Sequence, residues 1–133
     1  ELAQALNADL HEIVPAQHYT DADLDWMDKK SRSTLEMNDP ASRPAIAPAE
    51  LDLSGYDTVL LGFPIWWYVE PRIVDTFLES HDFSGKTVIP FATSGGSGIE
   101  RSESSLKAHC PAANWKPGKR LTRANAAGWA KSL

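Results

Sequence analysis

Three aromatic residues in a row form the segment of this chain best suited to chemistry with a flat molecule. Trp66, Trp67 and Tyr68 follow an apolar run, within the sequence PIWWYVE. Consecutive side chains cannot all point into one core, so at least one ring must lie at the surface or cover something planar. Two interpretations stay open at this point. The rings form a stacking wall for a planar cofactor, or they plug the core or an oligomer contact, because aromatic residues are enriched at interfaces.

A second segment combines glycines with hydroxyl groups. Residues 93–98 read TSGGSG. Glycines let a ligand approach the backbone closely, and the hydroxyls of Thr93, Ser94 and Ser97 can hydrogen-bond to heteroatoms of a ring. No lysine stands where a Walker loop requires one, so the segment does not predict a nucleoside triphosphate site. Taken alone it is typical of a flexible turn, and its significance depends on what lies beside it.

The elements that precede these segments place both of them at one edge of a sheet. Residues 57–63 and 86–92 are almost continuously apolar, as expected of strands covered on both faces. Residues 71–80 carry apolar side chains on one face, and residues 99–109 have Glu100 and Glu103 near their start, which predicts a helix over each segment. This alternation predicts an α/β fold with a doubly wound parallel sheet. Ligands bind at the carboxyl ends of strands in such sheets, and both segments lie there.

The remaining elements are less strongly indicated. Residues 15–50 contain four prolines and predict an irregular surface excursion, a kind of connection that is often functional. Within it, Thr20 followed by acidic residues predicts the start of a short helix with Leu24, Trp26 and Met27 facing inward. We further expect a helix over 1–8 that stops at Asn7, a strand over 9–14, a short final strand within 114–121, and a closing helix over 124–133 with Ala126, Trp129 and Ala130 inward.

Composition excludes several classes of protein. The chain has 133 residues, which predicts one domain over 1–133. Cys110 is its single cysteine, so no internal disulfide forms and a reducing compartment such as the cytoplasm is favoured. No apolar run approaches the roughly 20 residues that span a bilayer, which argues against a membrane protein.

Charge is distributed unevenly. Residues 1–106 hold all 18 acidic residues and 7 of the 13 basic ones, whereas residues 107–133 hold six basic residues and no acidic one. The acidic part argues against nucleic-acid binding, because it would repel phosphates. The basic tail is either a docking patch or a solvated surface. The four histidines have no metal-ligand spacing and predict ordinary surface or hydrogen-bonded positions: His11, His18, His81 and His109.

Two long stretches resemble the flavodoxin-like flavoproteins, in particular a short bacterial branch with a double-tryptophan loop. They are YDTVLLGFPIWWYVEPRIVDTFL and KTVIPFATSGGSG, and the stretch DLHEIVPAQHYTDADLDWMDKKSR is similar to the long loop of that branch. The resemblance implies a flavodoxin-like three-layer sandwich that binds FMN. It implies that the isoalloxazine ring lies between two loops, matched here by Pro64, Ile65, Trp66, Trp67 and Tyr68 and by Thr93, Ser94, Gly95, Gly96 and Ser97.

The resemblance also predicts a departure from the family pattern. The family opens with a central strand and a loop that wraps the FMN phosphate, and residues 1–8 match only the later part of its first helix. We therefore expect an N-terminally incomplete domain whose first strand is absent, and weak or absent FMN binding by this chain, because the phosphate loop is missing.

The leading functional hypothesis is an FMN-dependent redox protein, either an electron carrier or a small flavin reductase. Its partner would be a redox protein or a small quinone- or flavin-type acceptor, and no side chain is predicted to act as an acid or base. The alternative is a non-enzymatic module that associates through the aromatic loop and an open sheet edge, for example as a homodimer. A third interpretation is a fragment that folds only when its missing strand is supplied.

Overall fold

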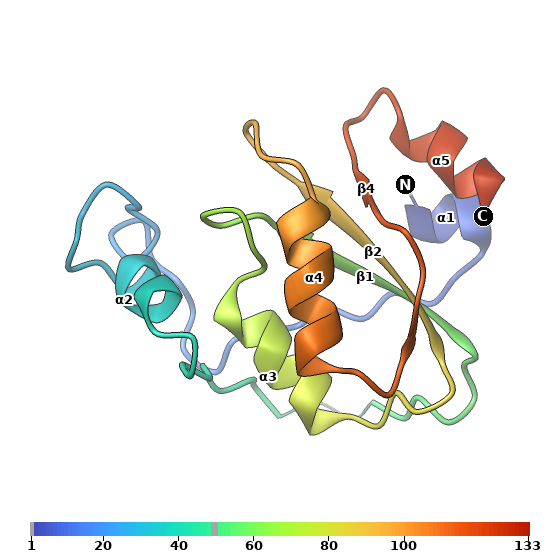
Figure 1. The fold of residues 1–133 in the computed structure, drawn as a ribbon, viewed down its shortest axis with the longest axis horizontal. Helices are drawn as coiled ribbons and strands as arrows, with labels where there is room; N and C mark the ends of the chain where they lie inside the picture. Colours follow the sequence, from blue (N-terminus) through green and yellow to red (C-terminus); the bar gives the residue numbers. More distant parts are fainter. Residues whose placement is uncertain (1, 49–50) are drawn as a thin grey trace.

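A parallel sheet forms the centre of the molecule, whose computed structural model describes residues 2–48 and 51–133 (Figure 1). Strand β1 (Thr58–Pro64) pairs along its whole length with β2 (Thr87–Thr93), in parallel. The other edge of β2 pairs first with β3 (Asn114–Trp115) and then with β4 (Lys119–Arg120), also in parallel. The predicted α/β fold with a parallel sheet is confirmed.

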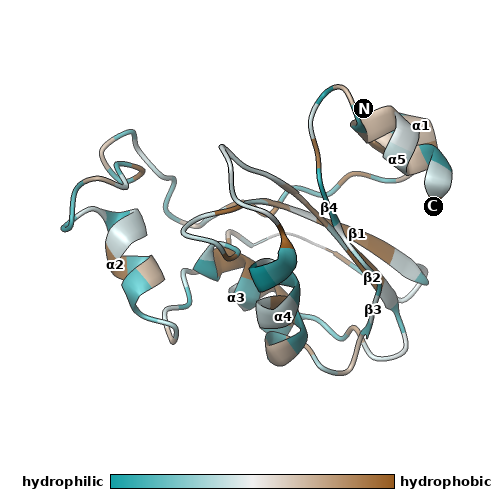
Figure 2. Ribbon diagram, turned by 45° about the horizontal axis from the view of Figure 1, so that its top comes forward, coloured by the Kyte–Doolittle hydropathy of each residue, from teal (hydrophilic) through white to brown (hydrophobic). Residues whose placement is uncertain are grey.

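Helices cover both faces of this sheet (Figure 2). On one face lie α3 (Arg72–Ser80) and α4 (Glu100–His109), and on the other lie α1 (Leu2–Leu6) and α5 (Ala126–Ser132). None of the helices in the described ranges has the length and apolar character needed to cross a membrane.

Alternation of side chains along the strands divides the packing between the two faces. Leu61 and Val88 point to the α3–α4 side, where they join a buried cluster with Val74, Phe77, Leu78, Phe83 and Leu106. Phe91 points to the opposite side, where its ring centroid lies 6.0 Å from that of Trp129 on α5. The inward positions predicted for Ala126 and Ala130 are confirmed, since both are buried.

Residues 9–14 do not form the predicted strand. The chain there is extended, and in this region only Pro15 makes a β-bridge, to Ile46. Across residues 2–48 and 51–133, no strand pairs with the outer edge of β1. A cavity of about 1600 Å³ lies beside that edge, lined by Leu10 and Ile13 on one side and Val59 and Leu61 on the other. Val14 alone in this segment bonds to another stretch of described backbone, since its carbonyl accepts from the Ala47 amide at 2.7 Å, and one such bond does not make a ladder beside β1.

The helix predicted from Thr20 makes only one turn. The expected cap is present, because the Thr20 amide donates to Asp23 Oδ2 at 2.9 Å and the Asp23 amide donates to Thr20 Oγ1 at 3.1 Å. The side chains of Asp25 and Asp28 then accept from amides two residues ahead, and such local bonds compete with helix formation. The predicted inward packing is therefore wrong, and three side chains are exposed: Leu24, Trp26 and Met27.

The helix of this excursion instead forms later. Helix α2 (Arg32–Asn38) begins after Ser31, whose side chain accepts from the Thr34 amide as an N-cap. Figure 1 shows α2 and its flanking loops standing apart from the sheet, on the side toward which β1 and β2 run.

The predicted final strand within 114–121 is divided into β3 and β4. Gly118 lies between them, and a Cβ atom at this position would stand 2.4 Å from the Pro90 carbonyl oxygen. The backbone approaches β2 so closely here that only glycine fits.

We expect Leu106→Ala to lower the free energy of unfolding by about 3 kcal/mol, because it leaves a cavity in the α3–α4 side of the core. Leu106 is fully buried, whereas Leu35 on α2 is 57% exposed. Leu35→Ala is therefore the control, and it should change stability by less than about 0.5 kcal/mol. Urea denaturation measures both. Equal losses for the two variants would contradict this assignment of the core.

Candidate functional site

A cavity of about 440 Å³ opens where β1 and β2 end. The segments that follow the two strands form two of its walls, and the excursion over residues 15–48 contributes the third. Seven of the ten predicted site residues line it: Ile65, Trp66, Trp67, Ser94, Gly95, Gly96 and Ser97. The structure thus brings both predicted loops together around one space.

The aromatic segment is folded into a very tight turn. The Trp66 amide donates to the Val69 carbonyl at 2.9 Å, and the Val69 amide donates back to the Trp66 carbonyl at 3.2 Å. Between them, Trp67 and Tyr68 have φ values of 48° and 76°. A two-residue turn of this kind requires positive φ at both central positions and favours asparagine and glycine. Two bulky aromatic residues in this conformation therefore store backbone strain, which is typical of functional sites.

This turn exposes one indole beside the cavity. Trp67 lines the cavity and is 40% exposed, and Trp26 from the excursion lines it while remaining 67% exposed. Large exposed aromatic surfaces on neighbouring segments are unfavourable in water unless something covers them. The two indoles provide apolar faces for a flat molecule.

Trp66 is fixed by contacts with the excursion. Its ring meets the ring of Tyr19 edge to face, with centroids 5.5 Å apart. The Tyr19 hydroxyl donates to Glu36 Oε1 at 2.5 Å, and the Arg32 guanidinium lies 3.7 Å above the Tyr19 ring. Burial, followed by the hydrogen bond to the Glu36 carboxylate, raises the pKa of Tyr19 well above its ordinary value. The phenol therefore stays protonated and keeps its bond to α2.

Residues 94–97 form the glycine–serine wall of the cavity, which two hydrogen bonds hold in place. The Gly96 amide donates to Ser94 Oγ at 3.1 Å, and Arg120 of β4 donates from Nη1 to the Gly96 carbonyl at 2.9 Å. No described atom lies within 4 Å of where a Cβ would stand on Gly95 or Gly96. This wall therefore leaves open space beside its backbone, into which a ligand can fit.

The other three predicted site residues face elsewhere. Pro64 lines the larger cavity beside β1. Tyr68 is 56% exposed, and its ring lies under the guanidinium of Arg101 on α4, 4.8 Å from the centroid. Thr93 is exposed, and its carbonyl accepts from the Ile65 amide at 2.9 Å, which ties the two loops together at their base.

Sequence reasoning missed the third wall of the cavity. Four lining residues come from the excursion: Leu24, Trp26, Ser33 and Met37. The sequence signal for this wall is Trp26, an aromatic residue among acidic ones in a long connection. Its acidic neighbours keep the ring near the surface, where it can cover a ligand. The sequence also does not show that Arg120 holds the loop over residues 94–97, because Arg120 is one of several basic residues near the C-terminus.

A family model described as Flavodoxin matches residues 1–132. No curated protein matches the chain.

Several solved structures are similar to it. A protein from Bacteroides uniformis, provisionally described as a flavoprotein, is 50% identical with a TM-score of 0.93, covering 98% of this chain and 85% of that chain. A second, from Bacteroides eggerthii with the same provisional description, is 49% identical with a TM-score of 0.90, covering 99% and 85%. A Lactobacillus acidophilus flavoprotein in complex with FMN is 20% identical with a TM-score of 0.71, covering 97% and 88%, which shows a shared fold.

The strain in the aromatic turn gives a direct prediction. Tyr68→Gly should be more stable than Tyr68→Ala by about 1 kcal/mol, because both lose the ring and only glycine accepts positive φ without cost. At the neighbouring Val69 the order should reverse, with alanine more stable than glycine. Urea denaturation of the four variants measures both differences, and the same order at both positions would show that Tyr68 is unstrained.

Proposed function

This chain belongs to the flavodoxin family, and from this premise we propose that it is an FMN-dependent redox protein, either an electron carrier or a small flavin reductase. The observation that carries the proposal is the cavity at the ends of β1 and β2, where exposed indoles face a wall of glycines and serines. This is the place where parallel α/β sheets bind their ligands.

The cavity fits the flat part of a flavin. Its volume of about 440 Å³ lies in the range usual for small-molecule sites, roughly 300–1,000 Å³. Trp67 and Trp26 offer apolar faces, and contact with an aromatic ring is worth about 1 kcal/mol beyond area burial. The open space beside Gly95 and Gly96 lets a ring edge approach the backbone. These features favour a planar heteroaromatic ligand over a flexible aliphatic one.

Each group of residues has a role in this proposal. FMN supplies the electron-transfer chemistry when it is bound. Trp67 and Trp26 would stack against the ring and keep water from it. Hydroxyl and amide groups of residues 94–97 would hydrogen-bond to the ring edge, and Arg120 would hold that segment in place through the Gly96 carbonyl.

One structural neighbour with this fold was solved with a flavin. The Lactobacillus acidophilus flavoprotein was solved in complex with FMN. At 20% identity this likeness shows the fold alone, so the cofactor of the present chain rests on its own cavity.

The rim of the cavity suggests the kind of partner. Leu24 and Trp26 line the cavity, and Asp21, Asp25 and Asp28, which are near them in the sequence, are exposed. Acidic groups around an electron-transfer site favour brief docking of a basic protein surface. The partner would be a basic redox protein, or a small quinone- or flavin-type acceptor that reaches the indoles directly. The single cysteine favours a reducing compartment, and we place the protein in the cytoplasm.

Trp67→Ala should weaken FMN binding by roughly tenfold or more, because it removes one stacking face. Tyr68→Ala is the matched control: it removes an exposed aromatic ring from the same turn, but one that lies under Arg101 instead of lining the cavity. It should leave the affinity within about twofold. Titration followed by flavin fluorescence measures both.

The same variants decide between the two classes of function. If Trp67→Ala abolishes self-association and leaves FMN binding unchanged, the aromatic turn belongs to an interaction module and the redox proposal fails. For protein that binds FMN, anaerobic addition of NADH separates the two redox roles: a reductase bleaches the flavin, whereas an electron carrier requires a reduced partner.

A further inference from the structure

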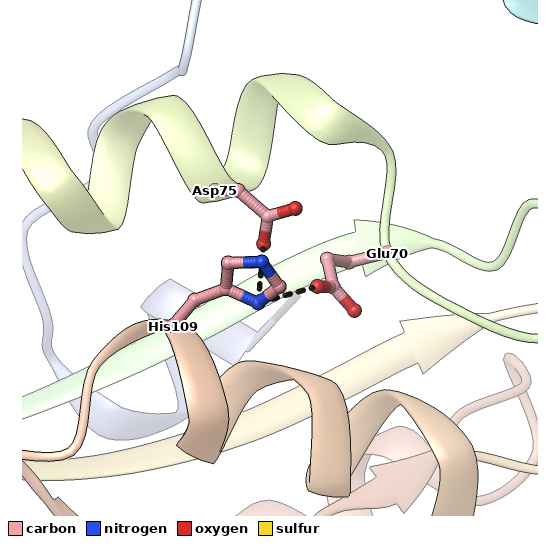
Figure 3. Close-up of side chains that lie close together, drawn as sticks. All are labelled: Glu70, Asp75 and His109. Carbon is pink, nitrogen blue, oxygen red and sulfur yellow. Dashed lines mark ion pairs between the residues drawn. The ribbon is translucent and has the colours of Figure 1, made fainter. Parts of the chain in front are cut away.

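Two carboxyl groups and an imidazole meet in the interior between α3 and α4 (Figure 3). Glu70 stands just before α3, Asp75 lies on its first turn, and His109 is the last residue of α4. His109 Nδ1 lies 3.5 Å from Asp75 Oδ1 and 3.8 Å from Glu70 Oε1. None of these residues lines the proposed flavin cavity, so the cluster is a separate feature.

The burial of this cluster is unusual for carboxyl groups. The side chains of Glu70 and Asp75 are 0% exposed, whereas that of His109 is 22% exposed and leaves a route from solvent. Glu70 Oε2 and both carboxyl oxygens of Asp75 have no hydrogen-bond partner in the part of the chain that the structure describes. A buried polar group without a partner costs about 1–3 kcal/mol, and more when it is charged. Three such oxygens in one place indicate that a ligand belongs between them.

The spacing of the donor atoms fits a metal ion. One atom from each of the three residues lies within 4.8 Å of the other two. Ligands of four-coordinate zinc, each about 2.0–2.1 Å from the ion, stand roughly 3.4 Å apart. Ligand atoms that lie within 4.8 Å of one another therefore need only small side-chain rotations to reach this spacing. We propose that Glu70, Asp75 and His109 form a binding site for a divalent transition-metal ion of the zinc type.

The donor set argues for this class of ion. Imidazole suits zinc and its transition-metal neighbours, whereas magnesium and calcium prefer oxygen ligands alone. Two carboxylates and one histidine leave a fourth position for water from the exposed side of His109.

Neighbouring groups already orient the three ligands. Ser105 Oγ donates to Glu70 Oε1 at 2.7 Å, and the Ser105 carbonyl lies 2.7 Å from His109 Nδ1. A carbonyl that accepts from one ring nitrogen leaves the other free to bind a metal, which is the arrangement found around metal-binding histidines.

The cation already nearby does not fill the site. Arg72 Nη1 lies 3.9 Å from Asp75 Oδ2, at the limit of an ion pair. The Arg72 side chain donates instead to the carbonyls of Glu36 and Met37 at the end of α2.

Zinc titration of the purified protein tests the proposal. Protein stripped with a chelator and titrated with Zn²⁺ at about pH 8 should bind one ion per chain, followed by calorimetry, and should melt at a higher temperature with zinc present. Asp75→Asn keeps the volume of the side chain and should weaken binding at least roughly tenfold, as should His109→Gln. Absence of saturable binding by the unmodified protein would overturn the site.

A second histidine provides the matched control. His81 likewise lies at the C-terminal end of a helix, and its Nδ1 lies 3.1 Å from the carbonyl of Phe77, four residues earlier, just as His109 lies beside that of Ser105. His81→Gln should bind zinc as the unmodified protein does. Equal affinity for Asp75→Asn, His109→Gln and the unmodified protein would show that zinc binds elsewhere.

If a variant does not fold, a measurement on the unmodified protein still tests the proposed site. Co²⁺ is paramagnetic and can replace Zn²⁺, so it should broaden the NMR signals of the His109 ring at lower concentrations than those of the three other histidines. Broadening that begins at His11, His18 or His81 would contradict the proposal.

Discussion

The parallel register between β1 and β2 is the constraint on which the candidate site depends. The strands pair residue for residue from Thr58 and Thr87 to Pro64 and Thr93, so both end at the same level of the sheet. The bond from the Ile65 amide to the Thr93 carbonyl extends this pairing by one residue. A slip of one position would turn Leu61 and its neighbours to the wrong face. The same strand register therefore buries the core and aligns the two loops.

The aromatic turn is then held in its strained shape from two sides. Tyr19 and α2 fix Trp66, as the edge-to-face contact and the bond to Glu36 show. Helix α4 holds the other end, because Ser102 Oγ donates to the Tyr68 carbonyl at 3.3 Å and Ser105 Oγ donates to Glu70. The same segment thus connects the cavity at the strand ends with the carboxyl cluster between α3 and α4. This tertiary support is what allows two aromatic residues to remain at positive φ.

The parts of the fold that can be predicted from sequence are those with strong local signals. The apolar runs of β1 and β2 and the amphipathic face of α3 are readable because burial requires apolar side chains at their positions. The strand ends then bring residues 65–67 and 94–97 together without further information. The strand predicted over residues 9–14 does not form. A strand also requires a partner strand within hydrogen-bonding distance, and the sequence does not show where partners lie.

Other features depend on contacts between distant segments. Trp26 reaches the cavity because Asp25 and Asp28 bond to nearby amides and stop a helix that would have buried it. The turn at Trp67 and Tyr68 carries residues that such turns normally avoid. Glu70 and His109 lie 39 positions apart and meet only through the packing of α3 on α4.

The central claim is that FMN binds between the two loops that this register aligns. The most direct measurement is NMR of the isotopically labelled protein with FMN added in steps. We predict the largest chemical-shift changes at the indole N–H groups of Trp26 and Trp67 and at the amides of residues 94–97, with little change along α3. Shifts concentrated in the cavity beside β1, or the absence of saturable shifts, would contradict it.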